Sequence, residues 1–157
     1  MTNNQREIYV QPGQGESYGV LGDVYTVKVK SEDTLGAYGF LEVTLQPQGG
    51  APAHTHSKEN ESFYILEGEL EFQIEEKIIV GTPGSFIHIP IGKLHSFTNK
   101  TETPVKVLIL LTPGGLEEFF AEFGTKVENS LSTPAKNPAD LQRLPGIAAK
   151  FGTEMKA

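Results

Sequence analysis

Three of the four histidines in this sequence lie in two short stretches that also hold a glutamate. His54 and His56 are two positions apart, so on an extended strand both imidazoles point to the same face. Glu61 follows the turn 57–60, and a hairpin there would return its carboxylate beside the two imidazoles. His95 starts a later strand, after the turn 90–94. Three neutral imidazoles and one carboxylate suit a divalent first-row metal and leave coordination positions open for substrate or oxygen.

The elements that must position these residues are short strands rich in Val, Ile, Phe and Thr. Glycine or proline separates many of these segments, which is typical of antiparallel hairpins that fold into a sandwich or barrel. In 69–75 the apolar and polar residues alternate, as they do on a strand with one buried face. We therefore predict an all-β fold. The predicted strands are 24–30, 37–45, 61–66, 69–75, 77–80, 85–90, 95–98 and 105–111.

The last third of the sequence has a different character. Pro113-Gly114-Gly115 ends the last predicted strand, and 116–123 carries apolar residues at helical spacing before Gly124. The segment 129–138 has the composition of a linker, and 139–151 is predicted as a second helix that breaks at Pro145. The first helix caps the barrel mouth, packs outside the barrel, or lies at a dimer interface, and the sequence leaves these alternatives open.

Length and charge exclude several classes of protein. A chain of 157 residues suits one domain with a core that needs no disulfide, and it has no cysteine for a zinc–thiolate site. Lys and Arg number 13 and Asp and Glu 20, so the net charge of −7 argues against a nucleic-acid partner. No apolar run approaches the ~20 residues of a membrane helix. We expect a cytoplasmic protein with neither a nucleic-acid nor a membrane partner.

An isolated His-x-His is more often structural than metal-binding, so the residues around it must show whether these histidines bind a metal. Both stretches resemble the paired signature motifs of the cupin superfamily, and 15 residues separate them. One departure is that four residues, rather than five, separate Gly49 from His54. The first stretch matches at His54, His56, Glu61 and Gly68, and the second at Gly84, Pro90, Gly92, His95 and Asn99.

The segments 21–27, 32–36 and 110–120 are similar to small single-domain cupins described as quercetin-dioxygenase-like. This resemblance implies a double-stranded β-helix, or jelly-roll barrel, over 19–112. An N-terminal segment 1–18 would precede it, and a C-terminal helical segment 113–157 would pack on it. It also implies one divalent transition metal (Fe, Mn, Ni, Co, Cu or Zn) held by His54, His56, Glu61 and His95, and a homodimer.

The implied activity is that of a metal-dependent dioxygenase, an oxidoreductase acting on a small aromatic or enolic substrate. Glu61 is the expected catalytic residue, either as a metal ligand or as the base that takes a substrate hydroxyl proton. The alternative is a non-oxidative cupin that uses the same barrel site to bind a small molecule or metal, or to act as an isomerase or lyase.

Strand alternation predicts which side chains accompany the ligands. If Glu61 faces inward, Phe63 and Ile65 do too, and Phe97 shares the face of His95. These three residues are therefore predicted to bind substrate in an apolar cavity, and the competing interpretation is that they are barrel core. His88 matches no ligand position, so we expect a structural or surface role for it, and Asn99 is expected to make structural hydrogen bonds.

Overall fold

A computed structural model of the chain describes residues 5–156. Its larger sheet has seven strands, in the spatial order β11-β1-β2-β3-β10-β5-β8, and every neighbouring pair is antiparallel. The strands are β1 (Glu16–Val20), β2 (Asp23–Val29), β3 (Gly39–Leu45), β5 (Asn60–Glu67), β8 (Phe86–Ile89), β10 (Val105–Thr112) and β11 (Thr125–Val127).

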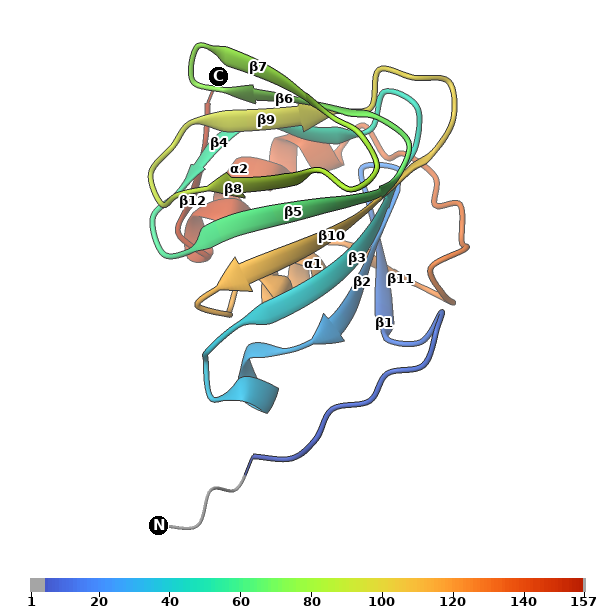
Figure 1. The fold of residues 1–157 in the computed structure, drawn as a ribbon, viewed down its shortest axis with the longest axis vertical. Coiled ribbons are helices and arrows are strands. Elements are labelled where there is room, and N and C mark those ends of the chain that lie inside the picture. Colours follow the sequence, from blue (N-terminus) through green and yellow to red (C-terminus); the bar gives the residue numbers. More distant parts are fainter. Residues whose placement is uncertain (1–4, 157) are drawn as a thin grey trace.

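The smaller sheet has five strands in the order β12-β4-β9-β6-β7, also antiparallel throughout. They are β4 (Gly50–His56), β6 (Leu70–Ile74), β7 (Lys77–Gly81), β9 (His95–Thr98) and β12 (Thr153–Met155). Figure 1 shows the helices α1 (Glu117–Phe123) and α2 (Asp140–Lys150) behind the strands in this view, with the C-terminal strand β12 beside β4. The all-β fold predicted from the sequence, with short C-terminal helices, is confirmed.

Alternating side chains build the core between the sheets. On β3, Leu41, Val43 and Leu45 are fully buried while the residues between them are half-buried. The central strand β10 repeats the pattern over its whole length. Strand geometry sends every second side chain inward, so a period-2 sequence produces one continuous apolar interior.

The two helices of the C-terminal segment pack on this core. α1 (Glu117–Phe123) buries Phe119, Phe120 and Phe123, and α2 (Asp140–Lys150) buries Leu144 and Ala148. A short 3-10 helix, η1 (Ser31–Thr34), joins β2 to β3. The expected break at Pro145 is wrong, because α2 continues through it. Burial of Leu144 and Ala148 against the core offsets the backbone hydrogen bond that the proline removes.

All eight strands expected from the sequence are present, and their ends agree to within two residues. β1, β4, β11 and β12 are not among the predicted strands, although His54 and His56 were considered on an extended strand. β1 runs across the expected boundary at residue 18. Within residues 5–156, neither helix has the length and apolar character needed to cross a membrane.

Candidate metal centre and adjoining pocket

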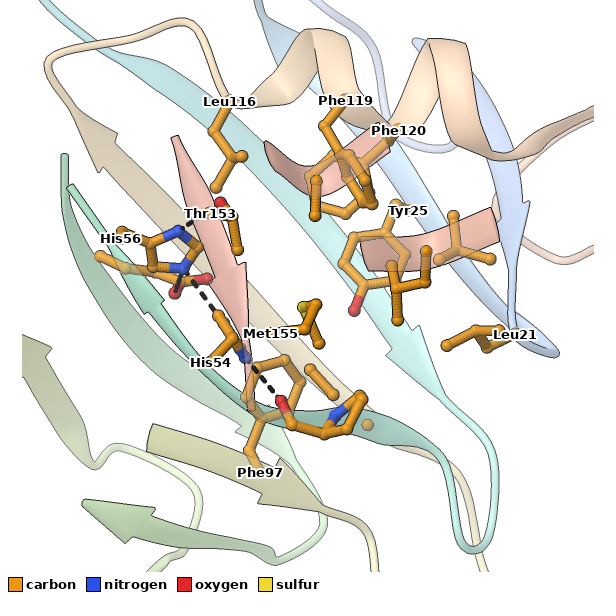
Figure 2. A pocket seen from close by; sticks show the side chains of 17 residues that line it. Leu21, Tyr25, His54, His56, Phe97, Leu116, Phe119, Phe120, Thr153 and Met155 are labelled. Atoms are coloured by element: carbon orange, nitrogen blue, oxygen red, sulfur yellow. Dashed lines mark hydrogen bonds and ion pairs between the residues drawn. The ribbon is translucent and has the colours of Figure 1, made fainter. Parts of the chain in front are cut away.

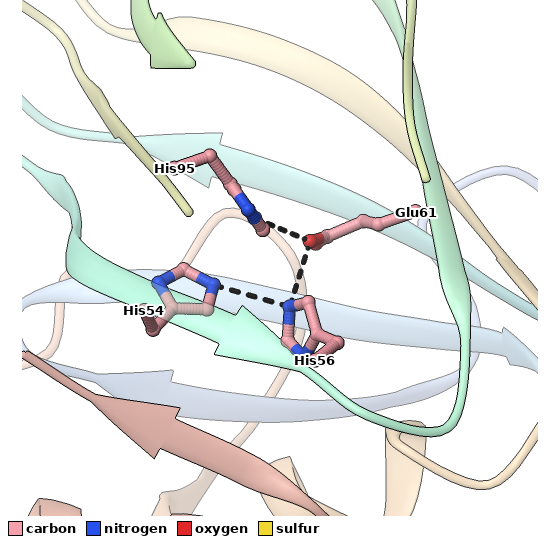
Figure 3. Close-up of side chains that lie close together, drawn as sticks. All are labelled: His54, His56, Glu61 and His95. Atoms are coloured by element: carbon pink, nitrogen blue, oxygen red, sulfur yellow. Dashed lines mark hydrogen bonds and ion pairs between the residues drawn. The ribbon is translucent and has the colours of Figure 1, made fainter. Parts of the chain in front are cut away.

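Three strands of two sheets bring the four predicted ligands together. β4 supplies His54 and His56, β9 supplies His95 directly opposite His54 in the register, and β5 of the other sheet supplies Glu61. All four side chains are buried, and one potential ligand atom from each lies within 4.8 Å of the others. Figure 3 shows the four side chains converging from these strands.

The inner atoms of the cluster are in close contact. Glu61 Oε2 lies 3.0 Å from His56 Nε2 and 3.1 Å from His95 Nε2. The Nε2 atoms of His54 and His56 are 3.1 Å apart. The three imidazoles therefore present the same ring nitrogen to one point, with the carboxylate beside it.

The outer nitrogens of the imidazoles fix which inner atoms can bind a cation. Nδ1 of His54 lies 2.6 Å from the carbonyl oxygen of Pro52, and Nδ1 of His95 lies 2.9 Å from that of Lys93. A carbonyl oxygen only accepts, so each Nδ1 carries the proton and donates it. Nε2 of both histidines is then left with a lone pair aimed at the centre, the arrangement found in metal-binding histidines.

This donor set fits a divalent transition metal. The Nε2 lone pair of His95 lies 3.1 Å from Glu61 Oε2, and two acceptors this close repel each other unless a proton or a cation lies near both. The adjacent Glu61 carboxylate adds negative charge in a buried site, where an unpaired charge is costly. Nitrogen ligands with one carboxylate are typical of iron, manganese, cobalt, nickel, copper and zinc sites.

Burial and mutual charge shift the pKa values of the cluster in different directions. Burial lowers the pKa of His54 to about 4. Burial would also lower the pKa of His56, but the hydrogen bond and charge of Glu61, with the charge of Glu59, raise it above its usual range. Burial opposes ionisation of Glu61, yet His56 and His95 together hold the pKa of its carboxyl well below its usual range. Glu61 is therefore an anion at neutral pH.

Backbone turns place the ligand-bearing strands close together. Gly50 has φ +144°, and a Cβ there would lie 1.9 Å from the carbonyl oxygen of Phe97 on β9. Only glycine allows this approach of β4 to β9. Gly92, with φ +84°, donates its N–H to the carbonyl oxygen of His56 at 2.8 Å. The turn before His95 is thereby attached to the strand that carries the other two histidines.

A pocket opens from the cluster toward the helices. Its walls come from β1, β2, β4, β5, β9, α1, α2 and β12, and most of the lining side chains are apolar. The cavity volume is about 70 Å³. Figure 2 shows Phe119 and Phe120 of α1 above the two histidines of β4, with Met155 of β12 between them and Phe97. The C-terminal segment therefore forms part of the wall of the pocket.

The residues predicted to bind substrate fall in two places. Phe97 lines the pocket, whereas Phe63 and Ile65 are fully buried and are not among its lining residues. Phe63 packs edge-on against Phe72 and Phe97, at ring-centroid distances of 5.0 and 5.2 Å. Strand alternation gave the inward direction of these side chains but could not distinguish the deep core from the pocket wall.

The two other polar residues named from the sequence lie away from the cluster. His88 is exposed, and its Nδ1 lies 2.8 Å from the hydroxyl of Ser62. Asn99 is fully buried, and its Nδ2 donates to the carbonyl oxygens of Leu45 and Thr103. Asn99 therefore ties two loop ends to one another.

Sequence reasoning did not identify two residues that contact His56. The hydroxyl of Thr153 on β12 lies 2.9 Å from His56 Nδ1, and Glu59 Oε1 lies 3.4 Å from the same nitrogen. Glu59 is 4% exposed, and its Oε1 has no hydrogen-bond partner within residues 5–156. Burial raises the pKa of Glu59. The position of Glu59 between two ligands was a local signal, whereas Thr153 is 97 residues from His56 and gave none.

Comparison with known proteins places this geometry in a family. A family model described as "Cupin domain" matches residues 41–111, which include all four candidate ligands. The chain is 32% identical over 124 residues to quercetin 2,3-dioxygenase of Bacillus subtilis (strain 168). That alignment covers 78% of this chain and 36% of the relative, so the chain spans about a third of the relative's length.

Solved structures share the fold at lower sequence identity. KdgF from Halomonas sp. superposes with a TM-score of 0.62 at 14% identity, over 71% of this chain and 99% of that one. A predicted oxalate decarboxylase from Thermotoga maritima gives a TM-score of 0.59 at 21% identity, and the superposition covers 69% of this chain and 99% of that one. The two signature motifs, the fold and the matching family model agree, so residues 41–111 of this chain form a cupin domain, as the sequence predicted.

Proposed function

We propose that this cupin is a metal-dependent dioxygenase that acts on a small aromatic or enolic hydroxy compound. The observation that carries the proposal is the position of the His54, His56, Glu61 and His95 cluster at the end of an apolar, aromatic-walled pocket. Such a pocket excludes water and accepts a flat, mainly apolar ligand next to the metal ligands. The 32% identity to a quercetin dioxygenase supports the same reaction class.

The four ligands would hold the metal through three Nε2 atoms and a carboxylate oxygen. A bound divalent transition metal would supply a Lewis acid for a substrate hydroxyl and a centre able to exchange electrons. The backbone carbonyls behind His54 and His95 keep both rings in the tautomer that such a role needs. Glu61, an anion whose oxygen faces the same point, is placed to accept the proton of a substrate hydroxyl as well as to ligate.

The size of the pocket favours compact substrates. Its volume of about 70 Å³ is below the roughly 150 Å³ of an engineered cavity that holds benzene. A one-ring or enolic compound therefore requires small movements of the lining side chains, and a three-ring flavonol requires displacement of α1. We expect the protein to prefer a compact enol or aromatic diol to quercetin.

Oxygen consumption tests the proposal. Protein loaded separately with iron, manganese, cobalt or nickel is incubated with quercetin, catechol or 2,4-pentanedione, which represent a flavonol, an aromatic diol and an enolisable diketone. We expect substrate-dependent oxygen uptake with at least one metal, lost in His95→Ala and kept in His88→Gln. Absence of uptake from every combination, with the metal bound, would favour the non-oxidative cupin, a binding protein or an isomerase or lyase.

A further inference from the structure

The pocket has few polar side chains, and all but one of them already have partners. His54, His56 and Glu61 contact one another in the cluster, and the hydroxyl of Thr153 lies against His56 Nδ1. The remaining polar side chain of the lining is that of Tyr25, whose hydroxyl has no hydrogen-bond partner among residues 5–156.

Packing holds the Tyr25 ring in one orientation. Tyr25 lies in the middle of β2, is 4% exposed, and stacks on Phe120 of α1 with ring centroids 4.3 Å apart and planes 15° from parallel. Figure 2 shows its hydroxyl pointing into the space enclosed by the lining side chains. Burial, with smaller effects of the Asp23 and Glu61 charges, raises the pKa of Tyr25 well above 10. The group therefore keeps its proton and can donate it.

We propose that the Tyr25 hydroxyl is the second polar anchor of this pocket and donates a hydrogen bond to an oxygen of the substrate. A hydroxyl left without a partner in an apolar site is costly, and a tyrosine that served only for packing could be phenylalanine. The proposal rests on the proposed function for the nature of the ligand, but it concerns binding rather than oxygen chemistry.

Two separated polar anchors define the class of ligand. One ligand oxygen would face the cluster of His54, His56, Glu61 and His95, and another would accept from Tyr25, while the apolar walls contact the carbon skeleton. The structure therefore assigns the pocket to compact hydroxylated or keto compounds with at least two oxygens. Hydrocarbons and single-oxygen ligands would leave one anchor without a partner, which is how a site that forms hydrogen bonds rejects analogues.

Anaerobic binding measurements test this role without depending on turnover. Catechol and quercetin are titrated into nickel-loaded wild type, Tyr25→Phe and Tyr18→Phe, and the dissociation constants are measured by isothermal titration calorimetry. Tyr18→Phe is the matched control, because Tyr18 is also buried on the same sheet but donates to Glu16 outside the pocket. Circular dichroism and nickel content verify that each variant is folded and loaded.

We expect Tyr25→Phe to weaken binding of at least one probe about three- to tenfold, which is the effect of one lost hydrogen bond, while Tyr18→Phe binds as the wild type does. Equal binding by Tyr25→Phe and wild type would overturn the proposal, and so would a wild type that binds neither probe. Tyr25-dependent binding without oxygen uptake would support this anchor and reject the dioxygenase. Oxygen uptake together with binding that does not depend on Tyr25 would support the dioxygenase and reject this anchor.

Discussion

Lowering the pH should release metal from the cluster because protons and metal compete for the same imidazole nitrogens. His56 is the group to consider first, since contact with Glu61 raises its pKa above the usual value for histidine. With an unchanged pKa of about 6.5, a fall from pH ~7.5 to ~5.5 would weaken binding about tenfold, or about 1.4 kcal/mol. The raised pKa increases this loss, toward the hundredfold limit for one proton over two pH units.

His54 should contribute almost nothing over the same interval. Burial lowers its pKa to about 4, so its imidazole is neutral and available at every pH above 5. The assay is calorimetric titration of nickel into metal-free protein between pH 5.5 and 7.5 in buffers that do not bind metal. His88→Gln, altered at an exposed histidine outside the cluster, should give the wild-type curve. A wild-type affinity that changed less than threefold across this range would refute the competition argument.

Three further substitutions separate the roles of residues near the cluster. Glu59→Gln should weaken nickel binding about 10- to 100-fold in calorimetry, because the carboxylate behind His56 contributes to its basicity, and wild-type affinity would contradict this. Phe63→Ala should lower the free energy of unfolding in urea by about 3–5 kcal/mol yet leave one nickel ion bound. A loss below about 1 kcal/mol would place this ring outside the core. Gly50→Ala should cost about 1–3 kcal/mol and lower nickel affinity, since its Cβ would displace β9 from β4, and an unchanged variant would disprove that close approach.

Local patterns were sufficient to predict the strands that carry Glu61 and His95, and to place His54 and His56 on one face once their segment is extended. His54 and His56 lie on one face because strands alternate every two residues, and Glu61 follows after a short turn. The packing of α1 on the core likewise followed from its helical spacing of phenylalanines, although the sequence left open whether it caps the barrel. In the structure, α1 contributes Phe119 and Phe120 to the pocket wall.

Local sequence patterns could not predict contacts between segments that lie far apart in the sequence. Thr153 reaches His56 only because β12 pairs with β4, and three-residue strands have too few positions to display an alternation. Phe63 and Phe97 both lie at inward-facing positions of the strand alternation, yet only Phe97 lines the cavity. That difference depends on where the two sheets and the helices meet, which is a property of the assembled fold.

Metal content tests the central claim most directly. Wild type and His95→Ala are stripped with a chelator, reconstituted with nickel, desalted and analysed by elemental mass spectrometry, with circular dichroism to establish folding. The cluster of His54, His56, Glu61 and His95 predicts one nickel ion per wild-type chain and less than about a tenth of that in folded His95→Ala. A wild type that holds no nickel, or a His95→Ala variant that keeps a full equivalent, would contradict the assignment of these four residues as a metal centre.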